Sequence, residues 1–439
     1  MRLAGHTGNQ VSVRPLDPTG KIAPREWMTA PATVAVIEAL TADGAEARFV
    51  GGCVRDALLK RPVKDIDIAT PEPPERVMAL LHEAGIKAIP TGVKHGTVTV
   101  AIGEWPIEVT TLRIDIETDG RHAKVAFTDD WMADAARRDF IINTLSCTPD
   151  GDIYDFFGAL DDLSQGRVRF VGNARERIEE DLLRGLRFFR FHATYGRPPA
   201  DVAALAACRR LAPRFAELSG ERRRDEMFRI LLAPNPADTT HLMQGEKIFD
   251  FILPEAGDVG RLRMLAWLET SAIKVDSVAA DSIRRLAALL DTDASGAETV
   301  AQRLKFSIPQ TKRLIAAVAF RRRLSPDGDG RDIRRALHRQ GAEEVRDLVL
   351  LAWAGELAIT PRLPRTRTQA WLGLLAAADA WTPLQFPLRG GDVIALGVEA
   401  GPRVGDLLGA VETWWQDGDY RAGHAACLEK LKTVLKDSN

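Results

Sequence analysis

Two aspartates separated by one residue, Asp65 and Asp67, are the pair with the clearest potential for chemistry in this sequence. They lie in "KDIDIAT", where charged and apolar residues alternate as in a strand with one polar face. Residues i and i+2 of a strand point to the same side, so the two carboxylates would lie side by side. Such close like charges repel unless a cation binds between them, and hard oxygen ligands suit Mg²⁺. The alternative is a solvated strand end.

A glycine turn precedes this pair. Gly51 and Gly52 follow the strand predicted at "ARFV" and precede the helix predicted at "VRDALL". Because glycine has no side chain, backbone N–H groups there can approach a phosphate, and a helix N-terminus adds positive potential. Arg55 would add a charged fork to the same phosphate. The alternative is a purely structural turn.

A third carboxylate, Glu108, lies in "IEVTTLR", which is also predicted to be a strand. If this strand neighbours the one that carries Asp65 and Asp67, Glu108 would complete a carboxylate trio. Two metal ions held by three carboxylates clamp the attacking and leaving oxygens of a phosphoryl transfer. A solvated strand is again the alternative.

A polar cluster in "ARRDFIINTL" combines Arg137, Arg138, Asp139 and Asn143. We predict a helix here, so Asp139 and Asn143, four residues apart, would share a face. A polar pair flanked by arginines suits a ribose with its phosphates. A polar cluster at a helix N-terminus is an equal alternative.

A second cluster, in "EEDLLRGLRFFRFH", places Asp181, Arg184 and Arg187 at three-residue spacing on a predicted helix. An aspartate accepts a hydrogen bond from a base amino group, and an arginine donates to ring nitrogens and carbonyls. The pair Asp181 and Arg184 therefore offers both halves of a Watson–Crick edge. In isolation an ordinary helical salt bridge explains the spacing as well.

The elements that must position these residues predict a small α/β head. Helices are expected over 31–40 and 73–85, and strands at "ARFV", "KDIDIAT", "HGTVTVAI" and "WPIEVTTLRID", with a turn at Gly103 between the last two. The sheet would be largely antiparallel. We expect a polar loop at "DIETDGRHAKVAF" and a hairpin or turns at "GDIYDFFGALDDLSQGRVRFV". Single helices are expected at "DDWMADAARRDFIINTLS" and "ARERIEEDLLRGLRFFRFHATYG".

Beyond residue 174 the periodicity is mostly helical and shows no repeat of fixed length. Residues 167–229 hold more arginines than acidic residues and no lysine. A local arginine excess on helices suits contacts with a phosphate backbone, although solvated helix faces explain any single arginine better.

Composition indicates a globular chain of 439 residues with 45% apolar and 27% charged residues and a net charge of −2. The four cysteines are far apart and lack metal-ligand spacing, which fits a reducing cytoplasm. No apolar run approaches the roughly 20 residues that span a bilayer, and the first residues resemble no signal peptide, so no membrane partner is expected. Composition and spacing assign no oligomeric state.

The order of these motifs resembles the class II tRNA nucleotidyltransferase and bacterial poly(A) polymerase family, among the polymerase β-like nucleotidyltransferases. The match runs from residue 46 to about 195, and "ERRRDEMFRILLAP" and "RGGDVIALGVEAGPRVGDLL" extend it. The resemblance implies an α+β fold: a polymerase β-like head with a mainly antiparallel sheet, then an elongated all-α neck, body and tail. The expected divisions are a polar leader at 1–30, the catalytic head at 31–160, the nucleotide-selecting neck at 161–250, and the tRNA-binding body and tail at 251–439.

The resemblance also implies a role for each candidate residue. Asp65 and Asp67 would hold catalytic Mg²⁺, with Glu108 as a third carboxylate. The incoming nucleotide would be bound by Gly51, Gly52, Arg55, Arg137, Arg138, Asp139 and Asn143, and its base would be read by Asp181 and Arg184 with Arg187 in support. The implied reaction adds CCA to tRNA from CTP and ATP. The alternatives are a poly(A) polymerase, an enzyme that adds only CC or only A, and a non-catalytic RNA-binding protein.

Overall fold

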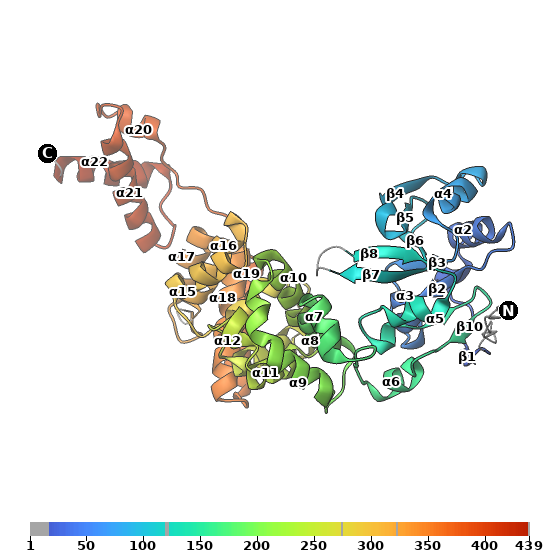
Figure 1. The fold of residues 1–439 in the computed structure, drawn as a ribbon. Coiled ribbons are helices and arrows are strands. Elements are labelled where there is room, and N and C mark those ends of the chain that lie inside the picture. Colours follow the sequence, from blue (N-terminus) through green and yellow to red (C-terminus); the bar gives the residue numbers. More distant parts are fainter. Residues whose placement is uncertain (1–16, 119–122, 274, 322–323, 438–439) are drawn as a thin grey trace, which may run out of the picture. The chain divides into compact units, whose positions relative to one another are not determined.

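The computed structural model describes residues 17–118, 123–273, 275–321 and 324–437 (Figure 1). Contacts divide the chain into unit 1, Met1–Glu226 with Leu242–Ile252, and unit 2, Met227–His241 with Leu253–Asn439. The chain changes unit within helix α10 (Gly220–Leu231) and again within α11 (Pro236–Gly245). The finer divisions expected at residues 30, 160 and 250 stay predictions.

Unit 1 contains an eight-stranded sheet in the order β1-β10-β9-β2-β3-β6-β5-β4. Among its described strands every neighbouring pair is antiparallel except β3 and β6, which confirms the mainly antiparallel sheet. The strands are β1 (Gly20–Lys21), β2 (Arg48–Val50), β3 (Ile66–Thr70), β4 (Ala88–Gly92), β5 (Thr97–Val100), β6 (Ile107–Thr111), β9 (Ser146–Cys147) and β10 (Asp152–Tyr154).

Helices surround this sheet and continue after it. The helices predicted over 31–40 and 73–85 are present, each with a proline in its first turn and a glycine of positive φ beyond its end. Unit 1 contains α1 (Glu26–Thr29), α2 (Pro31–Thr41), α3 (Gly52–Leu58), α4 (Pro74–Glu83), α5 (Trp131–Ala136), α6 (Ala159–Gln165), α7 (Ala174–Glu180), α8 (Leu183–Tyr195), α9 (Val202–Leu211) and α12 (Phe249–Ile252). Short 3₁₀ turns lie at Val93–His95, Ile141–Asn143 and Ala212–Glu217.

The segment expected to be a polar leader contributes structure to this unit. Residues 1–16 lie outside the described residues, but β1 pairs with β10, and α1 buries Trp27 and Met28. The Trp27 ring meets the Phe49 ring edge-on, with 4.8 Å between their centroids. This aromatic contact fixes α1 against the buried strand β2.

The prediction of a polar loop at "DIETDGRHAKVAF" is wrong for its described residues. They form most of β7 (Arg113–Thr118) and all of β8 (Ala123–Phe127), which pair as a separate two-stranded sheet. The strand expected at "WPIEVTTLRID" is accordingly divided between β6 and β7. Charged and apolar residues alternate in "RIDIET" as in a strand, but Ile114 and Ile116 are both exposed, so the alternation does not mark a buried face here. The "GDIYDFF" segment, expected as a hairpin or turns, is instead β10 followed by α6.

Two predicted continuous helices are also broken. Helix α5 ends at Ala136, and Asp139 then accepts a hydrogen bond from the Phe140 N–H at 2.9 Å. The long helix predicted over 174–195 is two helices, because Asp181 is extended (φ −148°, ψ 108°) and accepts the Leu183 N–H at 3.1 Å. Aspartate side chains compete with the helical ladder for backbone N–H groups, and both breaks lie at such a residue.

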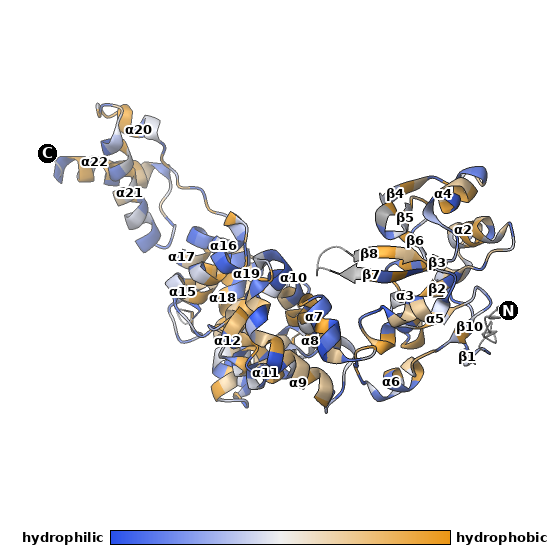
Figure 2. Ribbon diagram, in the orientation of Figure 1, coloured by the Kyte–Doolittle hydropathy of each residue, from blue (hydrophilic) through white to orange (hydrophobic). Residues whose placement is uncertain are grey.

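The elements of unit 2 in the described residues are all helices, joined by loops, which confirms an all-α body and tail, and most of these helices carry both apolar and polar residues (Figure 2). Helix α13 packs on α18 and α14, and α15 packs on α16. Its helices are α13 (Val259–Trp267), α14 (Ser282–Leu289), α15 (Ala294–Arg303), α16 (Ile308–Phe320), α17 (Gly330–Gln340), α18 (Ala342–Ile359), α19 (Arg365–Asp379), α20 (Gly390–Ile394), α21 (Pro402–Asp417) and α22 (His424–Asp437), with a π-helical turn at Leu268–Ala272. None of the helices in the described part of the chain is both long and apolar enough to cross a membrane.

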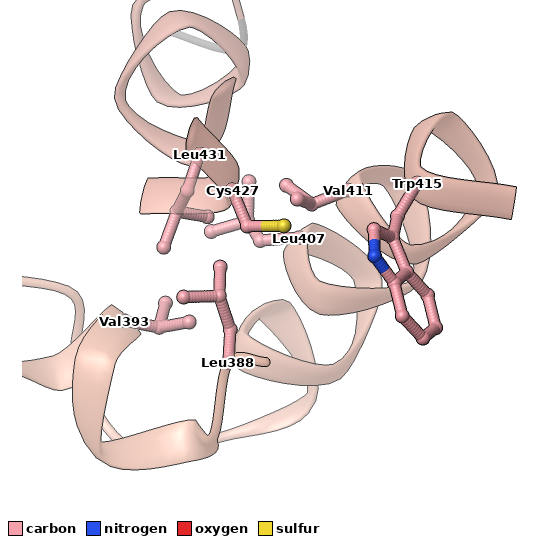
Figure 3. Packing of buried hydrophobic residues seen from close by; sticks show 7 residues of the cluster. All are labelled: Leu388, Val393, Leu407, Val411, Trp415, Cys427 and Leu431. Carbon is pink, nitrogen blue, oxygen red and sulfur yellow. The ribbon is translucent and has the colours of Figure 1, made fainter. Parts of the chain in front are cut away.

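The last three helices share a hydrophobic cluster (Figure 3). Val393 of α20, Val411 and Trp415 of α21, and Cys427 and Leu431 of α22 point toward one another and are nearly fully buried. The Trp415 Nε1–H donates to the Ala422 carbonyl oxygen at 2.9 Å, which satisfies the indole's polar atom at the edge of the cluster.

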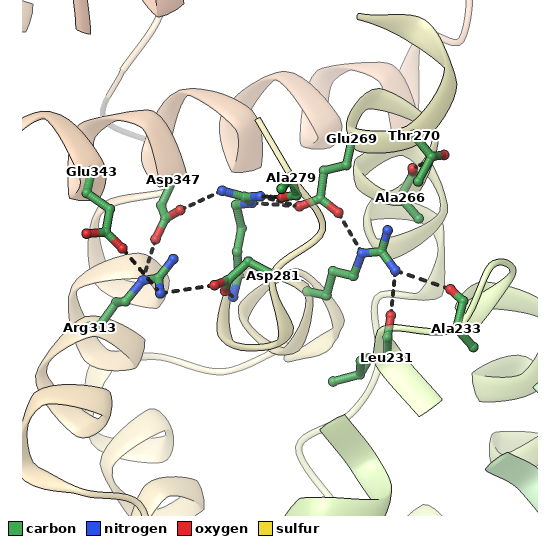
Figure 4. Close-up of polar contacts among 12 residues, drawn as sticks. Leu231, Ala233, Ala266, Glu269, Thr270, Ala279, Asp281, Arg313, Glu343 and Asp347 are labelled. Atoms are coloured by element: carbon green, nitrogen blue, oxygen red, sulfur yellow. Dashed lines mark hydrogen bonds and ion pairs between the residues drawn. The ribbon is translucent and has the colours of Figure 1, made fainter. Parts of the chain in front are cut away.

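A buried ion network joins the helices in the middle of unit 2 (Figure 4). The Glu269 carboxylate accepts from Arg284 Nε at 2.7 Å and from Arg285 Nε at 2.6 Å. Arg284 also donates to Asp347 of α18 at 2.9 Å, and Arg285 donates to the Leu231 carbonyl oxygen at 2.6 Å. All four charged side chains are at most 5% exposed, so each charge depends on its partners for stabilisation.

We expect Glu269→Ala to lower the free energy of unfolding by about 3–5 kcal/mol, because it leaves the Arg284 and Arg285 guanidinium groups buried without their shared carboxylate. Urea denaturation measures this loss. Glu429→Ala, which removes a fully exposed partner of Lys432 in the same unit, serves as the control and should not change stability measurably. Equal effects of the two substitutions would contradict the importance of the network.

Candidate active site

A cavity of about 570 Å³ in unit 1 gathers the residues singled out from the sequence. All of them except Glu108 line it: Gly51, Gly52, Arg55, Asp65, Asp67, Arg137, Arg138, Asp139, Asn143, Asp181, Arg184 and Arg187. Residues from the turn after β2, the start of β3, the α5 region and α8 thus share one space although they are far apart in sequence.

The carboxylates lie where two parallel strands begin. Asp67 of β3 is directly opposite Glu108 of β6 in the parallel register, which confirms that the two strands are neighbours. Asp65 lies just before β3. Burial, the Asp65 carboxylate and, more weakly, Glu108 raise the pKa of Asp67 to about 6, although Arg138 opposes them. Burial and the neighbouring carboxylates therefore outweigh the stabilisation that Arg138 and Arg55 give to the charge on Asp67.

Such an acidic end fits a divalent cation. Among the described residues no group of three or more His, Cys, Asp or Glu side chains is arranged to hold a metal ion. The predicted metal ligands, Asp65 and Asp67, are therefore a set of only two carboxylates. Mg²⁺ is commonly bound by one or two carboxylates together with substrate phosphates, which matches this pair beside a cavity rich in arginine. The exposed Glu108 stays a predicted third ligand.

The turn at Gly51 provides space for an arginine. Gly51 has φ +71°, and a Cβ atom there would lie 2.7 Å from Arg138 Nη1. Its N–H donates to the Leu145 carbonyl oxygen at 3.1 Å, so this amide already has a partner within the fold. Glycine is required here by backbone conformation and by the close approach of the Arg138 guanidinium.

A chain of hydrogen bonds connects the turn helix α3 with α8. Arg55 of α3 donates to the Asn143 side-chain oxygen at 2.5 Å, and Asn143 donates to Asp139 Oδ1 at 3.0 Å. Arg187 of α8 donates to Asp139 Oδ2, at 2.8 Å from Nε. The predicted contact between Asp139 and Asn143 is therefore present, although a 3₁₀ turn rather than a continuous helix brings them together.

Asp139 is the central member of this chain. Burial alone would raise the pKa of its carboxyl group, but the Arg187 guanidinium and the Asn143 amide outweigh that effect and hold the pKa below its usual range. The carboxylate therefore stays ionised at neutral pH and keeps Arg187 in place.

Arg137 and Arg138 are held by a carboxylate that the sequence did not single out. Asp134 of α5, 5% exposed, accepts from Arg137 Nη2 at 2.7 Å and from Arg138 Nη2 at 3.3 Å. Arg177 of α7 donates to the Arg138 carbonyl oxygen at 2.7 Å and to that of Arg137. Asp134 lies three residues before Arg137 and four before Arg138. This spacing is the sequence signal that would have identified it.

The predicted base-reading pair is divided by the helix break. Asp181 lies between α7 and α8, and Arg222 of α10 donates through one nitrogen to both its carboxylate oxygens, at 2.9 and 3.0 Å. Arg184 donates to the Arg177 carbonyl oxygen at 3.1 Å and to Glu180. Sequence spacing did not indicate Arg222, because it lies 41 residues beyond Asp181.

Arg113 brings a different kind of donor to the cavity. Its Nε and Nη1 atoms are buried and have no hydrogen-bond partner among the described residues. Burial and the nearby Arg137 lower the pKa of Arg113 to about 10, so it still carries its charge at neutral pH. Arg113 therefore adds a positive charge to the lining of the cavity.

Comparison with known proteins places this geometry in a family. A model described as the poly A polymerase head domain matches residues 47–169, and one described as a probable RNA and SrmB-binding site of polymerase A matches residues 202–258. The chain is 33% identical over 398 residues to "CCA tRNA nucleotidyltransferase 1, mitochondrial" of Danio rerio, covering 88% of this chain and 87% of that protein. The chain belongs to the tRNA nucleotidyltransferase and poly(A) polymerase family.

Solved structures agree with membership of this family. A Bacillus stearothermophilus CCA-adding enzyme in complex with CTP is 27% identical and has a TM-score of 0.72, with 92% of this chain and 98% of that chain covered. A "CCA-adding enzyme" of Leuconostoc citreum is 40% identical over 213 residues, 48% of this nucleotidyltransferase and 50% of the relative. The resemblance seen in the sequence motifs is thus confirmed over most of the chain.

We expect Asp139→Asn to destabilise the nucleotidyltransferase by about 2 kcal/mol at pH 7, because Arg187 loses a charged hydrogen-bond partner. A carboxyl group whose pKa is depressed by folding contributes stability above its unfolded pKa near 4 and loses it as the pH falls through the folded value. The difference from the unmodified chain should therefore shrink below about pH 4. Urea denaturation at several pH values measures it.

Asp150→Asn, at an exposed carboxylate after β9, is the control for this substitution and should leave stability unchanged. A difference between Asp139→Asn and the unmodified chain that does not depend on pH would show that the ionised carboxylate contributes nothing specific.

Proposed function

We propose that this chain adds CCA to the 3′ end of tRNA from CTP and ATP without a nucleic-acid template, releasing pyrophosphate. The observation that carries the proposal is one cavity in which an acidic strand end, several arginines and the Asp181–Arg184 region meet, within a chain similar over 88% of its length to a CCA tRNA nucleotidyltransferase. The 3′-hydroxyl of tRNA would attack the α-phosphate of the bound nucleotide.

The acidic strand end would form the metal site. Asp65 and Asp67 would hold Mg²⁺, with Glu108 as a third carboxylate from the neighbouring strand. Bound Mg²⁺ supplies a Lewis acid that lowers the pKa of a hydroxyl and stabilises charge on phosphate oxygens. The chain's own share of catalysis is then to position the reacting groups.

The arginines would hold the nucleotide's phosphates and ribose. Arg138 is 19% exposed and Arg137 is 16% exposed, so each reaches the cavity while Asp134 fixes its orientation. Arg55 has less freedom, because Asp56 and Asn143 already accept from its guanidinium group. Gly51, Gly52, Asp139 and Asn143 complete the proposed binding set, mainly by shaping and orienting these arginines.

The choice of nucleotide would be made at Asp181 and Arg184, with Arg187 in support. A carboxylate has about four lone-pair positions, so Asp181 can keep Arg222 and still accept from a base amino group. The two side chains, held in a fixed orientation, would thus select the nucleotide in place of a template strand.

We also propose that the protein acts in the cytoplasm. Its four cysteines are buried free thiols, which suits a reducing compartment. The relatives from Danio rerio and Homo sapiens are named as mitochondrial proteins, so cell fractionation of the native host is the deciding measurement.

Product length on a tRNA that lacks its CCA end tests the proposed reaction. With Mg²⁺ and both CTP and ATP, the product should be three nucleotides longer than the truncated tRNA. With CTP alone the product should be shorter than that. With ATP alone no CCA end should form. Asp67→Asn should reduce incorporation by at least about 10³-fold, because one ligand of the proposed Mg²⁺ site loses its charge.

The control is Asp150→Asn, which should keep the full rate. A long run of added AMP would identify a poly(A) polymerase, and addition limited to CC or A would identify a partial adder. Full incorporation by Asp67→Asn would refute the metal site, and no incorporation by the unmodified chain would favour a non-catalytic RNA-binding protein.

We expect Arg222→Gln to relax the choice among CTP, ATP and UTP, because the Asp181 carboxylate loses the contact that orients it. The KM for the correct nucleotide should rise several-fold while kcat changes little. Competition assays with paired nucleotides measure this effect, and Asp181→Ala should abolish the additional effect of Arg222→Gln in a double variant.

Arg214→Gln is the matched control, since this exposed arginine of the same unit forms a surface ion pair with Glu217. Nucleotide preference that is unchanged in both Arg222→Gln and Asp181→Ala would exclude base reading by Asp181.

A further inference from the structure

The last residue of helix α8, Tyr195, contacts the helix that follows the glycine turn. Its hydroxyl group donates to Asp56 Oδ1 of α3 at 3.0 Å, although the two residues are 139 positions apart in the sequence. This hydrogen bond joins α8 to α3 by a route that does not pass through Asp139. The helix that carries the proposed base-reading Arg184 therefore also reaches the proposed phosphate-binding turn directly.

Asp56 in turn holds Arg55, its neighbour in α3. The Asp56 carboxylate accepts from Arg55 Nε at 3.0 Å and from Arg55 Nη2 at 2.9 Å, which is a bidentate pair. The carboxylate oxygen that accepts from Nε is the same one that accepts from the Tyr195 hydroxyl group. Tyr195 thus fixes the carboxylate that sets the plane of the Arg55 guanidinium group.

The ring of Tyr195 makes a second contact with the same arginine. The Arg55 Cζ atom lies over the ring, 4.2 Å from its centroid, where the electron-rich face attracts a cation. Arg61, just beyond α3, also lies over the ring at 4.7 Å, and its Nη2 donates to the Thr194 carbonyl oxygen at 2.7 Å. Several contacts therefore hold the end of α8 against α3.

The contacts of Arg55 leave donors for a ligand. A guanidinium group has five N–H donors, and among the described residues the hydrogen bonds of Arg55 to Asp56 and Asn143 use one on each of its three nitrogens. Arg55 lines the candidate active site, and a Cβ atom at Gly52 would lie 3.7 Å from its Nη2. The guanidinium group is therefore beside the glycine turn, and its orientation there depends on Asp56 and Tyr195.

Tyr195 acts on this site from outside it. It is not among the described residues that line the cavity. Burial raises the pKa of the Tyr195 hydroxyl group, and Asp56 adds to this effect while Arg55 opposes it. The hydroxyl group is therefore protonated at neutral pH and donates to Asp56, but it is not in contact with the space where a nucleotide would lie.

We propose that Tyr195 is a positioning residue for nucleotide binding, which holds Arg55 in the orientation that accepts the triphosphate. The inference rests on the proposed nucleotidyl transfer. Because CTP, ATP and UTP carry the same phosphates, Tyr195 should affect the binding of all three equally and should not affect the choice among them. In this respect it differs from Asp181, Arg184 and Arg222, whose substitution should change that choice.

Steady-state kinetics of Tyr195→Phe, which removes only the hydroxyl group, test the proposal. The KM for CTP on a tRNA without its CCA end, and the KM for ATP on a tRNA that ends in CC, should each rise about five-fold while kcat changes less than about two-fold, because a contact used for binding is weakened. The inhibition constant of pyrophosphate should rise by a similar factor, since pyrophosphate has no base. The preference for CTP over UTP should be unchanged.

Further variants assign the effect to Arg55. Tyr195→Leu, which also removes the ring, should raise the same constants further than Tyr195→Phe does. In an Arg55→Gln background, Tyr195→Phe should have no additional effect. Tyr154→Phe is the matched control and should leave every constant unchanged, because the Tyr154 ring likewise lies over an arginine, Arg48 at 3.8 Å, but outside the cavity.

Parallel increases in both KM values and in the pyrophosphate inhibition constant support the proposal, and a general loss of structure would lower kcat and the thermal midpoint instead. Normal CCA addition by Tyr195→Phe with unchanged constants would overturn this inference alone. A change in nucleotide preference, or an effect that persists in the Arg55→Gln background, would also overturn it. No incorporation by the unmodified chain would overturn the proposed function and this inference with it.

Discussion

The carboxylate of Asp139 is the contact on which the candidate active site depends. It is almost completely buried, yet it accepts from Asn143 on one side and Arg187 on the other, and Asn143 in turn accepts from Arg55. Through this one group the turn after β2 and helix α8 are held at a fixed separation. The two regions differ in their proposed tasks, phosphate binding and nucleotide choice, so their alignment determines whether a selected nucleotide can react.

Arginine in this protein is used mainly in fixed pairs. Arg137 and Arg138 share Asp134, Arg184 contacts Glu180, and Arg222 contacts Asp181. A paired arginine can still donate to another group, because a guanidinium group has five N–H donors and a single carboxylate uses only some of them. In unit 2 the same side chain has another task, since Arg284 and Arg285 are buried and connect helices around Glu269. The arginine excess at residues 167–229 likewise includes residues that line the cavity, such as Arg184, and residues that do not, such as Arg209, which pairs with Glu246. Composition alone does not separate the two kinds.

Much of the head could be predicted from the sequence, because its strongest signals are local. The alternation at Asp65 and Asp67 and the proline and glycine boundaries of α2 and α4 depend on neighbouring residues only. The errors lie where a side chain competes with the backbone. Asp181 interrupts a predicted helix and Asp139 lies just after the end of another, each accepting a nearby N–H group, and helical periodicity does not report such competition. The partners Asp134 and Arg222 depend on tertiary packing, which sequence spacing reveals only for residues within one helix.

The break at Asp181 has a consequence for how this family can change over evolution. A residue inside a helix contributes to the backbone ladder and to two neighbouring turns, so replacing it alters stability and function together. Asp181 lies outside both α7 and α8, and its side chain accepts from the Leu183 N–H and from Arg222. If Asp181 reads the base as proposed, substitutions here change nucleotide preference without replacing a residue inside a helix. The break provides an adjustable position within an otherwise rigid catalytic unit, from which enzymes with different products can diverge.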